Sequence, residues 1–147
     1  MTEQPMPTSS LELFRWIAWA QRKAGEDWIR ERELSHEQAF VLGYLVQNPG
    51  AIQRDIAAVS RTSAASVTSL LKGLEQRGLV ERRPAPDNAR VKRVHATPAG
   101  AELVAGFPEA MVAVDETILA PLDTAERATL QQLLTKIVAE LPQPTRD

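Results

Sequence analysis

Apolar side chains recur at helical spacing along much of this 147-residue chain, and capping residues mark where the segments begin. A first helix is predicted from Ser10, with Ser9 or Ser10 as its cap. Trp16 and Trp19 lie off its main apolar stripe, so this helix is apolar on more than one face. A helix of this kind must bury both faces, and in a small protein the second face often meets another chain.

The middle of the chain predicts a pair of short helices joined by a tight turn. A helix that opens at Ser35 is stopped by the sequence Asn-Pro-Gly at residues 48–50. Residues 52–59 are expected to form the next helix, and Ser63 is expected to cap another that ends at Gly78. Two short helices joined by three or four residues are typical of a helix-turn-helix.

After Gly78 the apolar pattern changes to that of short strands. Residues 79–83 and 91–96 are expected to pair, with residues 84–90 as the turn between them. Pro84 and Pro86 cannot donate to a ladder, so they belong in the turn or on an edge. A helix-turn-helix followed by a hairpin is a winged helix, and the predicted class is mainly α with a small β-hairpin (α+β).

Two further helices are expected after the hairpin. Thr97 and Pro98 form a strong helix start, and Pro108 should bend or break the helix that follows. Asp123 and Glu126 resemble a capping box for a last helix. The predicted organisation is a winged helix-turn-helix over residues 35–97, a helical dimerisation region over 10–34 and 98–141, and flexible tails over 1–9 and 142–147.

Composition excludes several classes of function. The chain has no cysteine, which removes disulfides and thiolate chemistry and suits a reducing cytoplasm. The sequence shows no secretory signal and no apolar run of membrane-spanning length, so we expect no membrane partner. It also lacks a nucleophile elbow, a phosphate-binding glycine loop and a clustered set of metal ligands. We therefore predict no enzyme activity, no cofactor and no metal site.

The charges are strongly segregated along the chain. Between Ile52 and Thr97 there are nine basic and four acidic residues, whereas the rest of the chain has eight basic and fifteen acidic residues. A solvated surface of mixed charge is one interpretation. A basic winged helix between acidic arms favours the other, a face that binds a polyanion, and double-stranded DNA is the partner that such a fold fits.

Candidate DNA contacts follow from the expected geometry. Small side chains at the start of a recognition helix let it enter the major groove, and an arginine at a wing tip can enter the minor groove. Basic residues around the two helices are phosphate candidates, and an amide or carboxylate near the tip could orient the arginine. The predicted contacts are Arg54, Arg61, Ser63, Ala65, Ser66, Thr68, Ser69, Lys72, Arg77, Asn88, Arg90 and Lys92.

The sequence resembles the MarR family of winged helix-turn-helix transcription regulators. The resemblance is carried by NPGAIQRDIA, SVTSLLKGLEQRGLVERR and ATPAG, in the order and spacing of the family. It implies a homodimer held by the terminal helices, a pseudo-palindromic DNA operator, and repression relieved by a small ligand. It also implies that residues 63–69 read the major groove and that Arg90 enters the minor groove. The chain departs from the family pattern with Asn88 near the tip and Arg61 where a glycine is common.

The same resemblance implies a cleft for phenolic or other aromatic anions beside the dimerisation helices. Aromatic side chains with a nearby cation would suit such a ligand. The candidate lining residues, which could equally be core or dimer residues, are Arg15, Trp16, Trp19, His36, Tyr44 and Met111. The alternative to DNA binding is a winged-helix module that only binds other proteins, and this alternative does not require the basic excess or Arg90.

Overall fold

The computed structural model describes residues 5–144 and is mainly helical with one small sheet. It divides into two compact units, one up to Met111 and the other from Val112. The predicted tails, residues 1–9 and 142–147, lie partly outside the described residues. None of the helices within residues 5–144 combines the length and the hydropathy of a membrane span.

The first unit begins with two capped helices. Helix α1 (Ser10–Glu31) starts where predicted, and the Ser9 hydroxyl accepts a hydrogen bond from the backbone N–H of Glu12. Helix α2 (His36–Gln47) has a capping box, in which Ser35 and Gln38 satisfy each other's backbone N–H groups. Only the last third of α1 packs closely, because its buried residues are Gly25 and Ile29.

The helix-turn-helix consists of α3 (Gln53–Ser60) and α4 (Ala64–Gln76), as predicted to within a few residues. Ser63 caps α4 by accepting from the N–H of Ser66. Between the helices, Arg61 has a φ of 51° and a ψ of 44°, in the left-handed region. The N–H of Thr62 donates to Ala57 O at 3.2 Å, so the left-handed Arg61 ends α3 in a tight turn.

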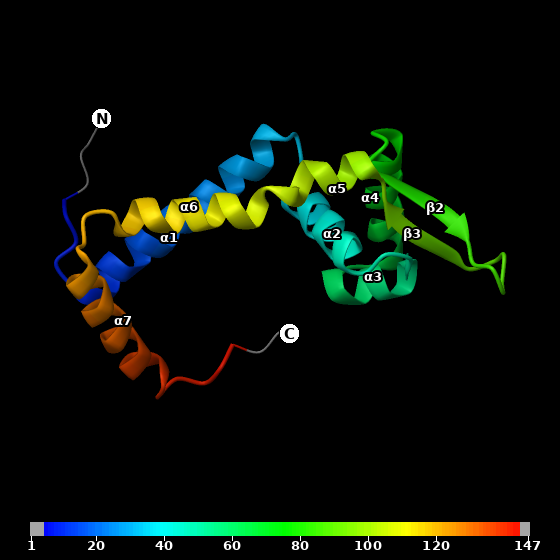
Figure 1. Cartoon of the computed structure of the whole chain (residues 1–147). Helices are drawn as coiled ribbons and strands as arrows, with labels where there is room; N and C mark the ends of the chain where they lie inside the picture. Colours follow the sequence, from blue (N-terminus) through cyan, green and yellow to red (C-terminus); the bar gives the residue numbers. More distant parts are fainter. Residues whose placement is uncertain (1–4, 145–147) are drawn as a thin grey trace. The chain divides into compact units, whose positions relative to one another are not determined.

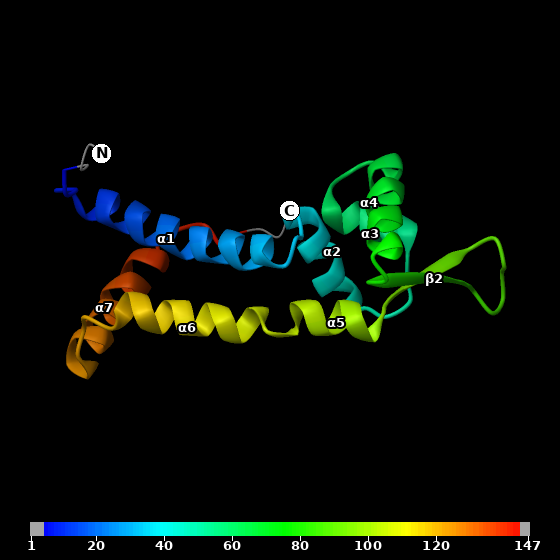
Figure 2. The same cartoon turned by 90° about the horizontal axis from the view of Figure 1, so that it is seen from above.

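The wing is an antiparallel pair of strands that extends away from α2, α3 and α4 (Figures 1 and 2). Strand β2 (Val80–Pro84) pairs with β3 (Lys92–Ala96) in the register Arg82 to Val94. The sequence did not predict the third strand, β1 (Ala51–Ile52), which pairs with the other edge of β3 and gives the order β1-β3-β2. A strand of two residues is too short to show an alternation of apolar and polar side chains. The sequence pattern therefore places Ile52 in the helix expected over residues 52–59.

The hydrophobic core lies where these elements meet. Val41, Leu42, Leu45, Ile56, Val67, Leu71, Leu74 and Val94 are the fully buried large side chains. They come from both helices of the helix-turn-helix, from α2 and from the wing. Burying a side chain of this size contributes about 1.5–3 kcal/mol. The core therefore fixes the orientation of α4 relative to the wing.

Helix α5 (Pro98–Ala105) is anchored to the base of the wing. The Thr97 hydroxyl donates to Gly78 O at 2.6 Å and accepts from the N–H of Gly100 at 3.1 Å. A Cβ atom at Gly100 would lie 2.0 Å from Leu79 O, a backbone atom that cannot rotate away. Only glycine allows this approach, which gives the ATPAG sequence a structural reason.

The chain after α5 forms two more helices. The helix that begins at Thr97 breaks at Gly106, near Pro108 as predicted, and α6 (Phe107–Leu119) follows. Helix α7 (Thr124–Val138) has the predicted capping box of Asp123 and Glu126, and it ends before Pro142. Neither α6 nor α7 contains a buried residue.

The role of Gly100 gives a stability prediction. Gly100→Ala should lower the free energy of unfolding by about 1–3 kcal/mol, because the added methyl group forces the backbone of α5 away from that of Leu79. Gly43→Ala is the matched control, since nothing lies within 4 Å of a Cβ at that helical position. The control should be neutral or stabilising by roughly 0.5–1 kcal/mol. Urea unfolding of both variants measures the difference, and equal stabilities would contradict the account of Gly100.

Candidate nucleic-acid interface

The predicted contact residues of α4 share its exposed face. Val67, Leu71 and Leu74 are fully buried on the opposite side of the helix. At 100° per residue this leaves Ala65, Ser69 and other predicted residues directed outward. The structure brings together on this exposed face Ser63, Ala65, Ser66, Thr68, Ser69 and Lys72.

Hydrogen bonds within the protein occupy several of these hydroxyl groups. Ser63 accepts from the N–H of Ser66 at 3.1 Å and donates to the Ser66 hydroxyl at 2.9 Å. The Thr68 hydroxyl donates to Ala64 O at 2.9 Å and accepts from the side-chain amide of Gln53. Gln53 was not predicted, because its partner lies fifteen positions away and no local pattern indicates the contact.

The wing tip is organised by its backbone. The N–H of Ala85 donates to Val91 O at 2.8 Å, and the N–H of Val91 donates to Asn88 O at 3.0 Å. The Asn88 side-chain oxygen accepts from the backbone N–H of Arg90 at 3.1 Å. Asn88 therefore holds the main chain of Arg90, as Asx turns do. The guanidinium of Arg90 makes no hydrogen bond or ion pair within residues 5–144.

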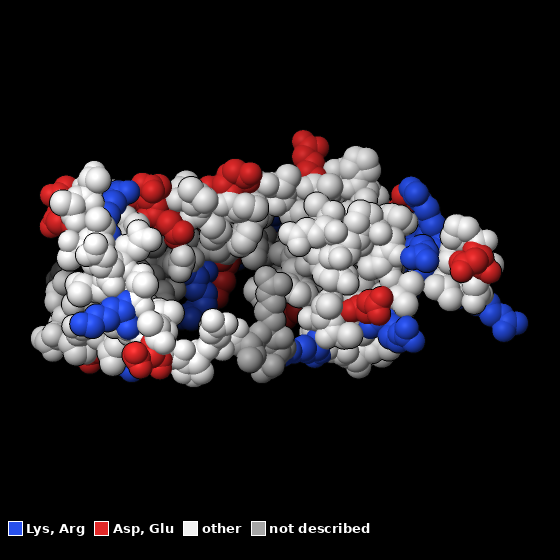
Figure 3. All heavy atoms as spheres, turned by 60° about the horizontal axis from the view of Figure 1, so that its bottom comes forward, with Lys and Arg blue, Asp and Glu red and all other residues white. Residues whose placement is uncertain are grey.

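The arginines in this part of the chain fall into two groups. Arg82 pairs with Glu75 at 2.7 Å, Arg83 pairs with Glu81, and Arg93 donates to Gly50 O at 3.1 Å. Five of the predicted contact residues have exposed cationic side chains that make no hydrogen bond or ion pair within the described residues. These are Arg54, Arg61, Lys72, Arg90 and Lys92. Lys and Arg side chains gather at the wing end of the surface and reach its tip (Figure 3).

Arg77 differs from the other predicted cations. Its guanidinium donates to Glu33 O at 2.6 Å and to Arg32 O at 3.1 Å, just beyond the end of α1. It thereby satisfies carbonyl groups at a helix C-terminus, where a positive charge is favourable. The structure thus gives Arg77 partners that compete with the predicted phosphate contact.

The predicted ligand residues lie at several places on the helices. Arg15, Trp16 and Trp19 are exposed on α1, and His36 is exposed at the start of α2. Tyr44 packs partly buried against the core, whereas Met111 lies beside Gly25. Position 16 is about 180° around α1 from position 25, so a single copy of the chain does not bring Trp16 and Met111 together.

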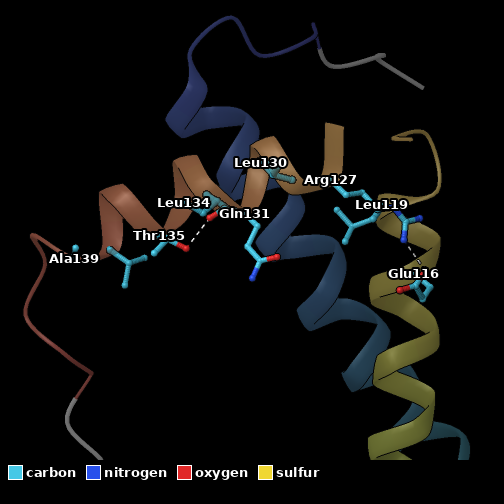
Figure 4. A pocket seen from close by; sticks show the side chains of 9 residues that line it. Glu116, Leu119, Arg127, Leu130, Gln131, Leu134, Thr135 and Ala139 are labelled. Atoms are coloured by element: carbon cyan, nitrogen blue, oxygen red, sulfur yellow. Dashed lines mark hydrogen bonds and ion pairs between the residues drawn. The ribbon is translucent and has the colours of Figure 1, made fainter. Parts of the chain in front are cut away.

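A groove of about 720 Å³ lies in the second unit, between the end of α6 and α7 (Figure 4). Arg127 and Glu116 form an ion pair of 2.8 Å in its wall. The groove is otherwise mostly apolar, with Leu119, Leu130 and Leu134 in its lining. None of the predicted ligand residues lines it.

Comparison with known proteins finds similarity to one family. Residues 33–91 match the model of the MarR family. A protein of Thauera aromatica, named as a proposed transcriptional regulatory protein for the hcr operon, is 31% identical over 97 residues, or 66% of this chain. The chain covers only 58% of the length of that relative.

Solved structures agree over nearly the whole chain. A single-residue mutant of Staphylococcus aureus MepR, bound to an oligodeoxyribonucleotide, has a TM-score of 0.83 and 26% identity, covering 92% of this chain and 100% of that one. MepR bound to ethidium bromide has a TM-score of 0.70 and 27% identity, covering 92% and 98% of the two chains. These similarities in sequence and structure support a MarR-family winged helix.

The structural similarity confirms the predicted fold, a winged helix-turn-helix that is mainly α with a small β-sheet. The relatives are named as transcription regulators, in agreement with the prediction that the chain is not an enzyme. Within residues 5–144 no cluster of three or more His, Asp or Glu side chains could hold a metal ion. The predicted DNA contacts lie mainly on the exposed face of α4 and on the wing.

Proposed function

We propose that this MarR-family chain binds a pseudo-palindromic DNA operator as a homodimer, represses transcription there, and is released by a small aromatic ligand. The observation that carries DNA binding is the set of five unpaired cations on α3, α4 and the wing. Nearby carboxylates at Glu75 and Glu81 pair with other arginines, so they leave these five free to contact phosphates. The MepR mutant bound to an oligodeoxyribonucleotide supports the proposal.

Four of these cations have roles that follow from their positions. Arg54 and Arg61 flank the helix pair, and Lys72 lies further along the exposed face of α4, where phosphates are the expected partners. Arg90 stands at the tip of a thin hairpin, held by the Asn88 bond to its main chain. An arginine in this position fits a narrow minor groove, whose negative potential is strongest over A·T-rich sequence.

Fluorescence anisotropy with duplex DNA at several salt concentrations tests this function. Wild-type affinity should fall steeply with salt, and Lys72→Ala should reduce the slope of log K against log salt by about 0.9, the value for one phosphate. Arg90→Ala should weaken binding without changing stability.

Arg77→Ala is the matched control for the same experiment. It should keep the wild-type salt slope and lower the stability of the protein instead, because its guanidinium binds carbonyl oxygens. No affinity at low salt, or an affinity that does not change with salt, would contradict DNA binding. That result would favour the alternative, a winged-helix module that binds only proteins.

The dimer proposal rests on apolar side chains that a single chain leaves exposed. On α1 these include Leu11, Phe14 and Trp19, which are 69%, 52% and 56% exposed. On α7, Leu133 and Ile137 are 56% and 58% exposed, and neither α6 nor α7 buries a residue. Apolar helix faces of this extent need a partner. A second copy of the chain fits, because it would supply the same faces and two DNA-binding units at fixed spacing.

Light scattering after size exclusion tests the dimer. The wild-type chain should have twice the 16.2 kDa mass of one copy. Ile137→Glu should shift the mass toward a single copy, because a charge in an apolar interface is unfavourable. Gln132→Glu, on the same helix, should leave the mass unchanged. A wild-type mass of one chain would overturn the proposed role of the terminal helices.

The proposed effector is a small aromatic molecule bound near the dimerisation helices. Arg15, Trp16, Trp19, His36, Tyr44 and Met111 are the candidate contacts, and a second copy could add to those that one chain leaves apart. MepR bound to ethidium bromide supports a small-molecule site in this family.

Salicylate is the probe that tests this site. It should lower DNA affinity in the anisotropy assay and quench tryptophan fluorescence, and Trp16→Leu should weaken both effects. Unchanged effects in Trp16→Leu would exclude that residue from the site.

A further inference from the structure

The side chain of Thr68 is held in one orientation by two hydrogen bonds. Its hydroxyl donates its single hydrogen to Ala64 O at 2.9 Å. The same oxygen accepts a hydrogen bond from the Gln53 side-chain amide, which comes from the first residue of α3. A threonine in a helix normally divides between two rotamers. A hydroxyl fixed from two directions selects one of them.

This arrangement changes what Thr68 offers to a DNA groove. The hydroxyl has no hydrogen left to donate, since a threonine has only one. The γ-methyl group, by contrast, makes no hydrogen bond and takes a fixed direction once the hydroxyl is fixed. Thr68 lies on the exposed face of α4, and Ala65, three residues earlier, is its neighbour on that face. The two side chains present apolar carbon at adjacent positions.

We propose that Thr68 recognises a thymine through its methyl group and that Gln53 is the positioning residue that fixes this methyl group. In the major groove the C5-methyl of thymine is the apolar feature that distinguishes it, and small apolar side chains contact it. The inference rests on the proposed DNA binding of α4. It assigns Gln53 a part in sequence discrimination, although Gln53 itself lies outside the recognition helix.

The experiment replaces single thymines by deoxyuridine, which removes only the C5-methyl group. The probe is the duplex that wild-type protein selects from random-sequence DNA, and each thymine is replaced in turn. We expect one thymine in each half-site at which the replacement weakens wild-type binding about three- to fivefold, the size of one buried methyl group. In each variant we compare the affinity for the thymine duplex with the affinity for the duplex that has deoxyuridine at that position. We call the quotient of these two affinities the affinity ratio.

Variants at position 68 separate the methyl group from the hydroxyl. Thr68→Ser keeps the hydroxyl and lacks the methyl group, so it should bind the thymine and deoxyuridine duplexes equally. Thr68→Val keeps the methyl group, and its branched side chain has a strongly preferred rotamer in a helix without a hydrogen bond. It should retain the wild-type ratio.

Variants at position 53 test the positioning role. Gln53→Met has a similar length and no amide, so it should reduce the affinity ratio toward one while the salt slope stays at the wild-type value. The double variant Gln53→Met with Thr68→Val should restore the ratio, because valine does not need the amide. Restoration by a change at position 68 also shows that the Gln53→Met chain folds.

Several outcomes overturn the inference. It is wrong if no thymine shows the effect, or if Thr68→Ser retains it. A uniform loss of affinity in Gln53→Met, with the ratio unchanged, would mean that Gln53 contacts the DNA itself. If no duplex is selected at all, the proposed function fails, and the inference that depends on it fails with it.

Discussion

The first turn of α5 can lie against the base of the wing because position 100 has no side chain. This contact brings together backbone atoms from three elements. Leu79 receives the N–H of Thr97 on its carbonyl oxygen and donates its own N–H to Leu74 O in α4. Gly78, with a φ of 71°, turns the chain between α4 and the wing. Helix α4, the base of the wing and the start of α5 therefore share one short network of backbone hydrogen bonds.

Ion pairs on the winged helix determine which of its cations stay unpaired. The region has four acidic residues, and two of them are paired with arginines next to the sheet. These exposed pairs contribute little to stability individually. Their main effect is on which cations stay free, because Arg82 and Arg83 are engaged while Arg54, Lys72 and Arg90 are not. The unpaired positive charges lie on α3, on α4, in the turn between these helices and on the wing.

Local signals in the sequence predicted most of the fold. Ser35, Ser63, Thr97 and Asp123 cap the helices that they were expected to cap, because a cap depends on residues only three positions apart. Contacts between distant residues were not predictable in this way. Arg77 bonds to carbonyl groups 44 and 45 positions earlier, and nothing near position 77 indicates them. Phe14 fits an inner stripe by its spacing but is 52% exposed in the single chain.

The turn between α3 and α4 has a consequence for how this protein can change over evolution. Arg61 occupies a left-handed conformation that costs a side-chain-bearing residue roughly 1–2 kcal/mol relative to glycine. The same residue carries one of the unpaired cations beside the recognition helix. Selection for a more stable fold and selection for affinity thus act in opposite directions at this single position. Arginine at this position combines a strained backbone with an exposed positive charge beside the recognition helix.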